Sequence, residues 1–214
     1  MLIQNTYGAG YQQNGTRLII RENETRIERG MFADAGWIEK VVIKSPCIEI
    51  GMGAFHGCRN LKEVVIEGEC SSIGVEAFKG CVGLRKFSAK QGIQKIGYAA
   101  FHGCILLESL EGIDRVEKLG AMSFYGCVKL GPVLTFNSCR SIEEGSFLEC
   151  EDLVCLRIPG SCEFTISDGA SYASYDVMHV DPGCTVERIE ETFSKFMNPP
   201  FERLVECKAF GEMG

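Results

Sequence analysis

Twelve cysteines give this 214-residue chain its most versatile side chains, because a thiol can bind zinc, form a disulfide or act as a nucleophile. Nine of them fall into two rows with an interval of 23 residues. The first row is Cys58, Cys81, Cys104, Cys127 and Cys150. The second row is Cys47, Cys70, Cys139 and Cys162, with Ile93 and Val116 in the two places between them and Cys184 as a shifted member. Because Ile and Val replace Cys there, the position favours a small apolar group, and we expect buried, reduced thiols.

Zinc and disulfides are the two alternatives for these rows. A structural zinc site takes four ligands, usually from closely spaced pairs of cysteines, and the members of the rows form no such pair. Disulfides between neighbouring members are compatible with the distance between adjacent strands, but a row of five cannot pair completely. We therefore expect no metal and no cofactor. Outside the rows lie Cys155 and Cys207, and we expect Cys155 to point outward from a strand and to be the thiol that reacts first with a labelling reagent.

The histidines and glycines give no catalytic pattern. His56 and His102 share a row with Lys79, Tyr125 and Leu148, so that this position accepts almost any side chain. Two repeats separate the two histidines, about 10 Å on adjacent strands, which is too far to share a metal ion. No Ser/His/Asp or Cys/His constellation follows from the spacing, and the glycines form neither a P-loop nor a dinucleotide motif. We expect no catalytic residue. A cysteine-dependent enzyme stays as an alternative, which a deep pocket with a perturbed thiol or carboxylate would support.

A repeat of 23 residues explains the positions of the thiols. The same interval relates Phe55, Phe78, Phe101, Phe124 and Phe147, and it relates Leu61, Leu84, Leu107, Leu130 and Leu153. One unit, which we call a rung, has the pattern I-G-x-x-A-F-x-G-C-x-x-L-x-x-V-x-I. The alternation in L-x-x-V-x-I predicts a strand, the glycine predicts a tight corner, and the A-F segment predicts one or two turns of α or 3₁₀ helix. A rung cannot bury its apolar face alone, but stacked rungs can.

The run from Ile73 to Leu84, I-G-V-E-A-F-K-G-C-V-G-L, resembles the BspA-type leucine-rich repeat family. The resemblance covers roughly residues 17–185. It implies an α/β-type repeat solenoid, a right-handed superhelix with one parallel β-sheet face and short helical or 3₁₀ turns opposite. It also implies a role in adhesion or protein recognition, often at bacterial or protist surfaces. Later units depart from the pattern and are expected to stack less regularly: Ser123 and Ser146 replace Ala, and Glu143 and Glu149 replace Gly.

Three regions follow from the extent of the repeat. Residues 1–16 are expected to form an N-terminal cap, with a hairpin turn at Asn14-Gly15. Residues 17–185 hold about seven to eight rungs, of which the last are degenerate. Residues 186–214 are expected to form a C-terminal helical cap, because apolar residues recur there at helical spacing. Those residues are Val186, Ile189, Phe193 and Phe196.

Composition excludes several classes of partner. The net charge of −7 disfavours nucleic acid and anionic membrane surfaces, and no apolar stretch is long enough for a membrane span. The N-terminal sequence lacks the pattern of a secretory signal. Together with the many thiols this favours a reducing cytoplasm, whereas the family resemblance favours the cell surface. We expect the partner to be another protein of unknown identity.

The outward positions of the strands predict where that partner binds. If Val64 and Ile66 point inward, the alternate positions face solvent, and translation along the chain by the interval of the repeat gives the exposed rows. Apolar residues gather in the second half of this surface, where an exposed cluster is typical of an interaction site. The candidate residues are Ile113, Pro132, Leu134, Phe136, Cys155 and Arg157. In the alternative interpretation the C-terminal segment covers this patch, or a local change of register buries Phe136.

We therefore expect a non-catalytic recognition or scaffold module that binds a protein through its sheet face or its C-terminal cap. A structural subunit that assembles through the ends of the rung stack is the alternative. On the first interpretation, Leu134→Asp with Phe136→Ser should abolish capture of the partner and leave the fold intact.

Overall fold

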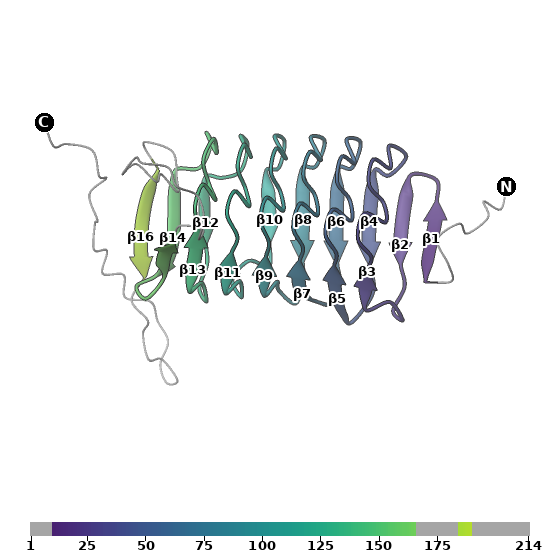
Figure 1. Ribbon diagram of the computed structural model, residues 1–214, viewed down its shortest axis with the longest axis horizontal. Helices are drawn as coiled ribbons and strands as arrows, with labels where there is room; N and C mark the ends of the chain where they lie inside the picture. The colour runs from purple at the N-terminus through teal and green to yellow at the C-terminus, as the bar shows by residue number, and fades with distance from the viewer. Residues whose placement is uncertain (1–9, 166–183, 190–214) are drawn as a thin grey trace, which may run out of the picture.

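The computed structural model describes residues 10–165 and 184–189, in which the chain forms a stack of rungs side by side along one long axis (Figure 1). Most of the strands belong to two parallel sheets that run along this axis. The first sheet has the order β1 (Tyr11–Asn14), β2 (Arg17–Ile20), β4 (Lys40–Ile43), β6 (Glu63–Ile66), β8 (Lys86–Ala89) and β10 (Ser109–Glu111). The second sheet has the order β15 (Glu163–Thr165), β13 (Ser141–Glu143), β11 (Lys118–Leu119), β9 (Lys95–Ile96), β7 (Glu69–Ile73), β5 (Cys47–Ile50) and β3 (Arg26–Ile27). A third sheet has the order β12 (Val133–Thr135), β14 (Cys155–Pro159) and β16 (Thr185–Ile189).

The second sheet corrects the expectation of a single sheet. A rung contains two short strands, one in each sheet, joined by a turn segment. Several strands of the second sheet, such as Lys95–Ile96 and Lys118–Leu119, have only two residues. Two residues are too few to show the alternation by which a strand is recognised in a sequence.

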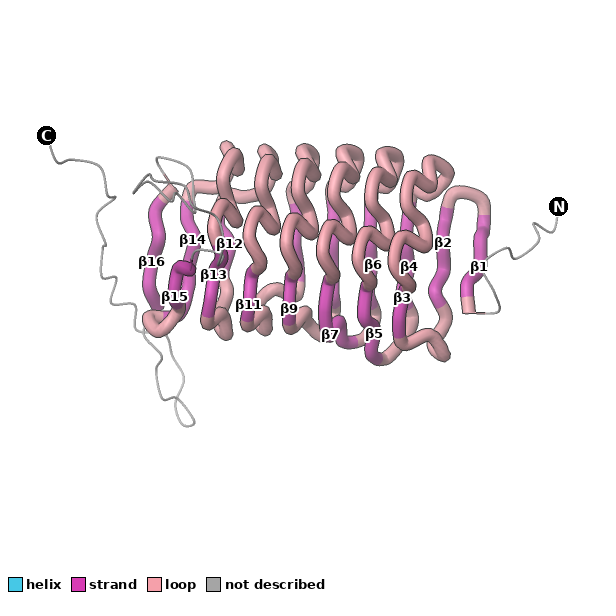
Figure 2. Tube along the Cα trace, in the orientation of Figure 1, coloured by secondary structure: helices cyan, strands magenta, loops and turns pink. Residues whose placement is uncertain are grey.

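The turn segments are not helical, so the expected α or 3₁₀ turns are wrong for the described residues. Figure 2 shows these segments as loops. The amide of His56 bonds to Gly53 in its own turn at 3.0 Å, but the amide of Phe55 bonds to Ala77 in the next rung at 2.8 Å. Because alternate amides bond between rungs, a continuous helical ladder cannot form. Left-handed residues recur as well, and they include Glu76 (φ 53°) and Met122 (φ 54°), which are not glycine.

Phenylalanine stacking forms the axis of the core, as the repeat predicts. Six rings from successive rungs stack nearly parallel, with neighbouring centroids 5.1–5.4 Å apart. They belong to Phe32, Phe55, Phe78, Phe101, Phe124 and Phe147. All six side chains are buried, so each aromatic ring packs on the rung before it and the rung after it.

The predicted corner glycines lie where one rung approaches the next. A Cβ atom on Gly51 would be 2.5 Å from the carbonyl oxygen of Ile27 in the preceding rung, and one on Gly74 would be 2.8 Å from the carbonyl carbon of Gly51. Both distances are shorter than a van der Waals contact, so only glycine allows the rungs to stack this closely there.

The first rung is covered by a hairpin. Strand β1 pairs antiparallel with β2 through the turn at Asn14-Gly15, and Gly15 has a left-handed φ of 61°. The ring of Tyr11 on β1 meets Phe32 edge-on, with 5.6 Å between their centroids. This strand therefore closes the apolar end of the phenylalanine stack.

At the other end, the expected C-terminal helix does not begin at residue 186. Val186 and Ile189 lie in β16, which runs parallel to β14. The rest of the expected helix, with Phe193 and Phe196, lies outside the described residues, as does most of the expected last rung. No helix in the described part of the chain is long and apolar enough to cross a membrane.

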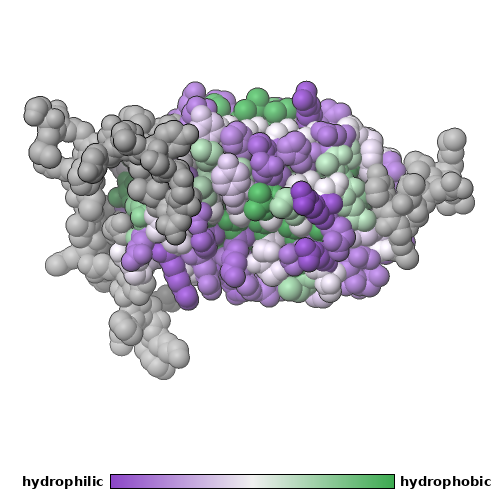
Figure 3. Space-filling model, viewed as in Figure 1, coloured by the Kyte–Doolittle hydropathy of each residue, from purple (hydrophilic) through white to green (hydrophobic). Residues whose placement is uncertain are grey.

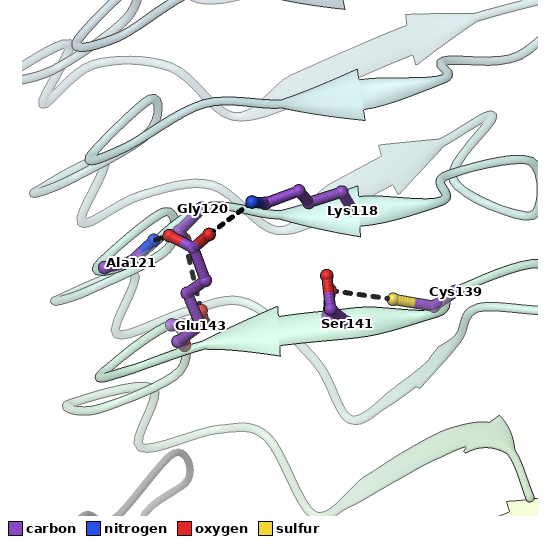
Figure 4. Close-up of polar contacts among 7 residues, drawn as sticks. Lys118, Gly120, Ala121, Cys139, Ser141 and Glu143 are labelled. Carbon is purple, nitrogen blue, oxygen red and sulfur yellow. Dashed lines mark hydrogen bonds and ion pairs between the residues drawn. The ribbon is translucent and has the colours of Figure 1, made fainter. Parts of the chain in front are cut away.

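The departures from the repeat in the later rungs are accommodated by new polar contacts (Figure 4). Glu143 replaces a corner glycine, and its carboxylate accepts a hydrogen bond from the amide of Ala121 at 3.1 Å and pairs with Lys118 at 2.6 Å. Ser146, in place of alanine, donates to the carbonyl of Gly120 at 3.2 Å. The rungs thus remain stacked, and β13 keeps its parallel partners on both sides.

The first row of thiols is buried throughout. In the second row Cys70, Cys139 and Cys162 are buried, Cys47 is exposed, and the shifted member Cys184 is half-buried. Cys47 is exposed because β5 and β7 pair with a bulge next to Ile48. The bulge aligns Ile48, not Cys47, with Cys70. The prediction that Cys47 belongs to the buried row is therefore wrong. No group of three or more metal-binding side chains occurs in the described parts of the chain.

Candidate recognition surface

The predicted apolar patch is mostly core. Phe136 is fully buried, and Leu134 and Ile113 are each 6% exposed. Cys155 is also buried, whereas Pro132 is exposed and Arg157 is half-buried. The expectation that these residues form an exposed cluster is therefore wrong for four of the six.

A change of register explains the burial of Leu134 and Phe136. Strand β12 pairs with β14 so that Leu134 lies beside Leu156, which is one position nearer along the chain than the regular interval of the repeat. Val133, expected to point inward, is instead 44% exposed. Because side chains alternate along a strand, a shift of one residue moves every side chain to the opposite face. The alternative interpretation, a register shift that buries Phe136, describes this part of the structure.

Ile113 is buried for a different reason. The inward position at the end of each strand holds Ile43, then Ile66, then Ala89 and finally Gly112. Gly112 has a left-handed φ of 86°, and a Cβ atom on it would lie 2.1 Å from the carbonyl oxygen of Ala89. The chain therefore leaves the strand at Gly112, and Ile113 joins the core.

Cys155 and Arg157 alternate with the inward residues of β14, as predicted, but neighbouring strands flank them. Cys155 lies between Val133 of β12 and Thr185 of β16 and is nearly inaccessible. Arg157 pairs with Glu187 at 2.7 Å, and this hydrogen bond raises the pKa of the Arg157 guanidinium. Because Cys155 is buried and Arg157 is paired, neither side chain is available as a main contact with a partner protein.

The outward face of the first sheet is basic, although the whole chain has a net charge of −7. We call this face the basic sheet face. Its outward positions and strand ends carry six basic side chains and three acidic ones. The basic residues are Arg17, Arg21, Lys40, Lys44, Lys86 and Lys90, and the acidic residues are Glu63, Glu67 and Glu111. The face therefore has a net charge of opposite sign to the rest of the molecule.

Most of this positive charge is not neutralised by ion pairs among the described residues. Lys40 forms an ion pair with Glu63, and Ser88 donates to the carboxylate of Glu111 at 2.7 Å. In contrast, four basic side chains have no ion pair within the described residues. They are Arg17, Lys44, Lys86 and Lys90.

Beside the basic sheet face, charges cancel across neighbouring rungs. Lys62 pairs with Glu39 and Arg85 pairs with Glu108, each at 2.8 Å. The excess positive charge is thus confined to the sheet itself.

An apolar strip runs between the two charged rows of the basic sheet face. Ile19, Val42 and Val65 lie beside one another on β2, β4 and β6. Apolar residues in the middle with charged residues around them are the usual anatomy of a protein interface. The pairing of β2 with β4 places Ile19 beside Val42.

One hollow in the described structure contains a thiol. It is open, has a volume of about 480 Å³, and is lined by Asn137, Ser138, Cys139, Arg140, Pro159 and Ser161. A hydrogen bond with Cys162, together with burial, raises the pKa of the Cys139 thiol. The thiol is therefore protonated at neutral pH, which is the opposite of what a cysteine nucleophile requires.

Comparisons with known proteins identify the repeat family of this chain. The family model described as "BspA type Leucine rich repeat region" matches six copies over residues 9–107 and 71–198. No curated protein is similar enough to the chain to count as a relative.

Three solved structures resemble the chain. A leucine-rich repeat protein of T. pallidum is 26% identical with a TM-score of 0.54, and the match covers 69% of this chain and 67% of that one. One from Bacteroides ovatus is 25% identical with a TM-score of 0.62, covering 71% and 42%. A leucine-rich cell surface protein from Faecalibacterium prausnitzii is 22% identical with a TM-score of 0.61, covering 86% and 47%, and supports the fold alone. The chain spans less than half the length of the last two proteins.

Proposed function

We propose that this chain, which belongs to the BspA-type leucine-rich repeat family, is a non-catalytic recognition module. In this proposal it binds an acidic surface of a partner protein through its basic sheet face. Proteins of this repeat architecture generally act in protein interaction or as scaffolds. The additional step concerns the surface and the chemistry of the partner.

The observation that carries the proposal is the set of basic side chains along the strands that form no ion pair within the described residues. Lys86 and Lys90 lie on one rung and Lys44 two rungs away, about 10 Å at the spacing of adjacent strands. Parallel strands hold these positions fixed relative to each other, which reduces the entropy lost when a partner binds. A positive face on a negative molecule also orients an acidic partner before contact.

The apolar strip supports the same surface. Ile19 and Val65 are half-buried, so they leave apolar surface from which a partner can exclude water, whereas Val42 between them is buried. The charged rows lie on both sides of this strip. Charged side chains at the rim of an interface mainly raise the association rate, whereas the apolar centre slows dissociation. We therefore expect salt to weaken binding chiefly through the association rate.

The test starts with capture of a partner by the full chain, identification of that partner by mass spectrometry, and measurement of the affinity with both proteins purified. Lys86→Glu combined with Lys90→Glu should then weaken binding at least tenfold, with most of the loss in the association rate. The matched control is Lys95→Glu combined with Arg140→Glu, which makes the same change in charge around the second sheet.

Raising the salt concentration should weaken binding of the unaltered chain and have little effect on the Lys86→Glu/Lys90→Glu variant. Equal affinities for the two double variants would contradict the proposal, and so would binding that does not depend on salt.

A further inference from the structure

Two rows of side chains along the turn segments share an unusual pattern. The first turn row follows the interval of the repeat and consists of Arg29, Met52, Val75, Tyr98, Ala121 and Glu144. The second turn row, at the same interval, starts one rung later, after Gly36, and consists of Arg59, Val82, Ile105, Val128 and Glu151. Each row begins with an arginine, continues with apolar residues, and ends with a glutamate. We call the surface that carries both rows the turn face.

Five of the seven apolar residues of these rows are exposed, whereas Ala121 is buried and Val128 is half-buried. Eight large hydrophobic side chains are exposed in the described part of the chain, and five of them lie in the two rows. They are Met52, Val75, Val82, Tyr98 and Ile105. Tyr98 and Ile105, near the middle, are 46% and 43% exposed. Figure 3 shows apolar surface gathered along the upper edge and near the centre of this view, with hydrophilic residues between the two areas.

The charged ends of the rows have no ion-pair partner among the described residues. Arg29, Arg59, Glu144 and Glu151 form no ion pair within the described residues. Four rungs separate Arg59 from Glu151, about 19 Å at the spacing of adjacent strands. Screening in physiological salt acts over about 8 Å, so the two ends of one row do not neutralise each other.

Near the middle of the turn face, in contrast, the charges between the rows are already satisfied. Lys79 pairs with Glu76 at 2.6 Å, and this hydrogen bond lowers the pKa of the Glu76 carboxyl. The His102 ring stacks on Tyr125 with 4.9 Å between centroids, and burial lowers the pKa of His102. The middle of the turn face therefore carries no unbalanced charge at neutral pH.

We infer that the turn face joins two copies of this chain, with their long axes antiparallel and a twofold axis across the middle of the rows. In this arrangement each row meets its own counterpart in reverse order. Arg59 of one copy lies opposite Glu151 of the other, Arg29 lies opposite Glu144, and the apolar residues between them meet in the middle. A twofold interface is self-complementary in this way, and it is the commonest arrangement of oligomers.

Both rows place the twofold axis at nearly the same height. The midpoint of the second turn row is Ile105, and the midpoint of the first lies between Val75 and Tyr98. The two midpoints differ by half a rung, about 2.4 Å, which the long side chains of Arg and Glu can span. A parallel arrangement is disfavoured because it would bring the arginine ends of the two copies together and place Glu144 opposite Glu151.

This association goes beyond the proposed recognition function and uses a different surface. The basic sheet face lies on strands β2, β4, β6, β8 and β10, whereas the turn segments carry the two rows. A dimer formed through the turn face would leave both basic sheet faces free, so that it presents two binding surfaces to a partner.

The experiment measures the mass of the full chain in solution by analytical ultracentrifugation, in low salt and over a range of concentrations up to about 100 µM, where even a micromolar dimer is well populated. We expect twice the monomer mass of 23.6 kDa, and dissociation as the salt concentration rises. Ile105→Asp should give a monomer, and Lys86→Glu on the basic sheet face should leave the dimer unchanged. Circular dichroism and thermal unfolding check that each variant is folded.

A charge exchange tests the orientation. Arg59→Glu alone and Glu151→Arg alone should each raise the dimer dissociation constant at least tenfold, because each places like charges opposite one another. The two changes together should restore it to within about threefold of the unaltered value. A monomer at all concentrations, a dimer that survives Ile105→Asp, or a double variant no better than the single ones would overturn the inference.

Discussion

The thiol of Cys104 donates a hydrogen bond to the backbone carbonyl of Phe78 in the preceding rung, with 3.2 Å between Sγ and O. Each of the other thiols in the first row donates the same hydrogen bond to the carbonyl of the phenylalanine in the preceding rung, at 3.0–3.1 Å. Ile and Val replace cysteine only in the second row, which the spacing assigned to small apolar groups. From the second rung onward the first row contains cysteine alone, because the side chain there donates a hydrogen bond to the preceding rung as well as filling space; the first rung has Ala35 in this position.

Removal of one such thiol should therefore cost more than its small size suggests. We expect Cys104→Ala to lower the free energy of unfolding by about 1–2 kcal/mol, through the lost hydrogen bond and the cavity. Cys104→Ser keeps a donor toward Phe78 and should cost less. Urea denaturation of both variants measures the difference, and equal losses would mean that the thiol acts only by its volume.

The buried thiols also predict alkaline destabilisation. Burial raises the pKa of Cys104 and Cys127, and it raises the pKa of Cys70 to about 12. In the unfolded chain these thiols titrate at about pH 8.5, so above that pH the unfolded state binds fewer protons than the folded state. Stability is fully present below pH 8.5 and falls as the pH rises, by about 1.4 kcal/mol per pH unit for each such thiol.

Cys70→Val gives a matched control for this pH dependence. The position lies beside Ile93, and Val116 occupies it two rungs along, so that valine fits the row. Denaturation under reducing conditions between pH 7 and 10 should show a slope smaller by about 1.4 kcal/mol per pH unit in the variant. An unchanged slope would mean that Cys70 does not contribute.

Two serines that replace alanine in the same row should respond in opposite directions. The buried hydroxyl of Ser123 has no hydrogen-bond partner within the described residues, whereas that of Ser146 donates to Gly120. Ser123→Ala should therefore raise the free energy of unfolding by about 1 kcal/mol, and Ser146→Ala should lower it by a similar amount. Thermal unfolding compares the two, and a loss of stability in Ser123→Ala would show that its hydroxyl is satisfied.

The sequence predicts most of the fold because the repeated residues are those that must pack. The phenylalanines stack and the corner glycines meet the preceding rung at the predicted positions. The turn segments could not be predicted in the same way. Their shape depends on left-handed residues such as Glu76 and Ala99, whose side chains give no sign of that conformation, and on amide bonds to the next rung.

The candidate site could be predicted less well, because it depends on the register of single strands. Translation by the interval of the repeat gives the correct inward residues for β4, β6, β8 and β14 and fails for β12. A connection that is one residue longer or shorter leaves apolar residues at the repeated positions, so the sequence gives no sign of it. It nevertheless turns every side chain of the strand to the opposite face of the sheet.

Cys47 is exposed at the bulge between β5 and β7, whereas Cys155, which was expected to be the reactive thiol, is buried. A maleimide reagent added to the folded protein should modify Cys47 within minutes, because reaction requires access to the thiolate. Cys155 and the first thiol row should react only on unfolding. Mass spectrometry of proteolytic fragments measures both, and faster labelling of Cys155 would restore the original prediction.

The register of β12 gives the most direct test of the corrected surface. Phe136 is buried against Phe147, with 5.9 Å between centroids, whereas Val133 points outward on the same strand. Phe136→Ala should lower the free energy of unfolding by about 3–5 kcal/mol, because it leaves a large cavity in the core. Val133→Ala should change it by less than about 0.5 kcal/mol, as expected for an exposed side chain. An unbroken repeat interval through β12 predicts the reverse order.

Leu134→Asp with Phe136→Ser should therefore unfold this end of the stack and cannot serve as a surface variant. If urea denaturation showed Val133→Ala to be the more damaging change, Val133 would be the inward residue, and Leu134 and Phe136 would return to the exposed face.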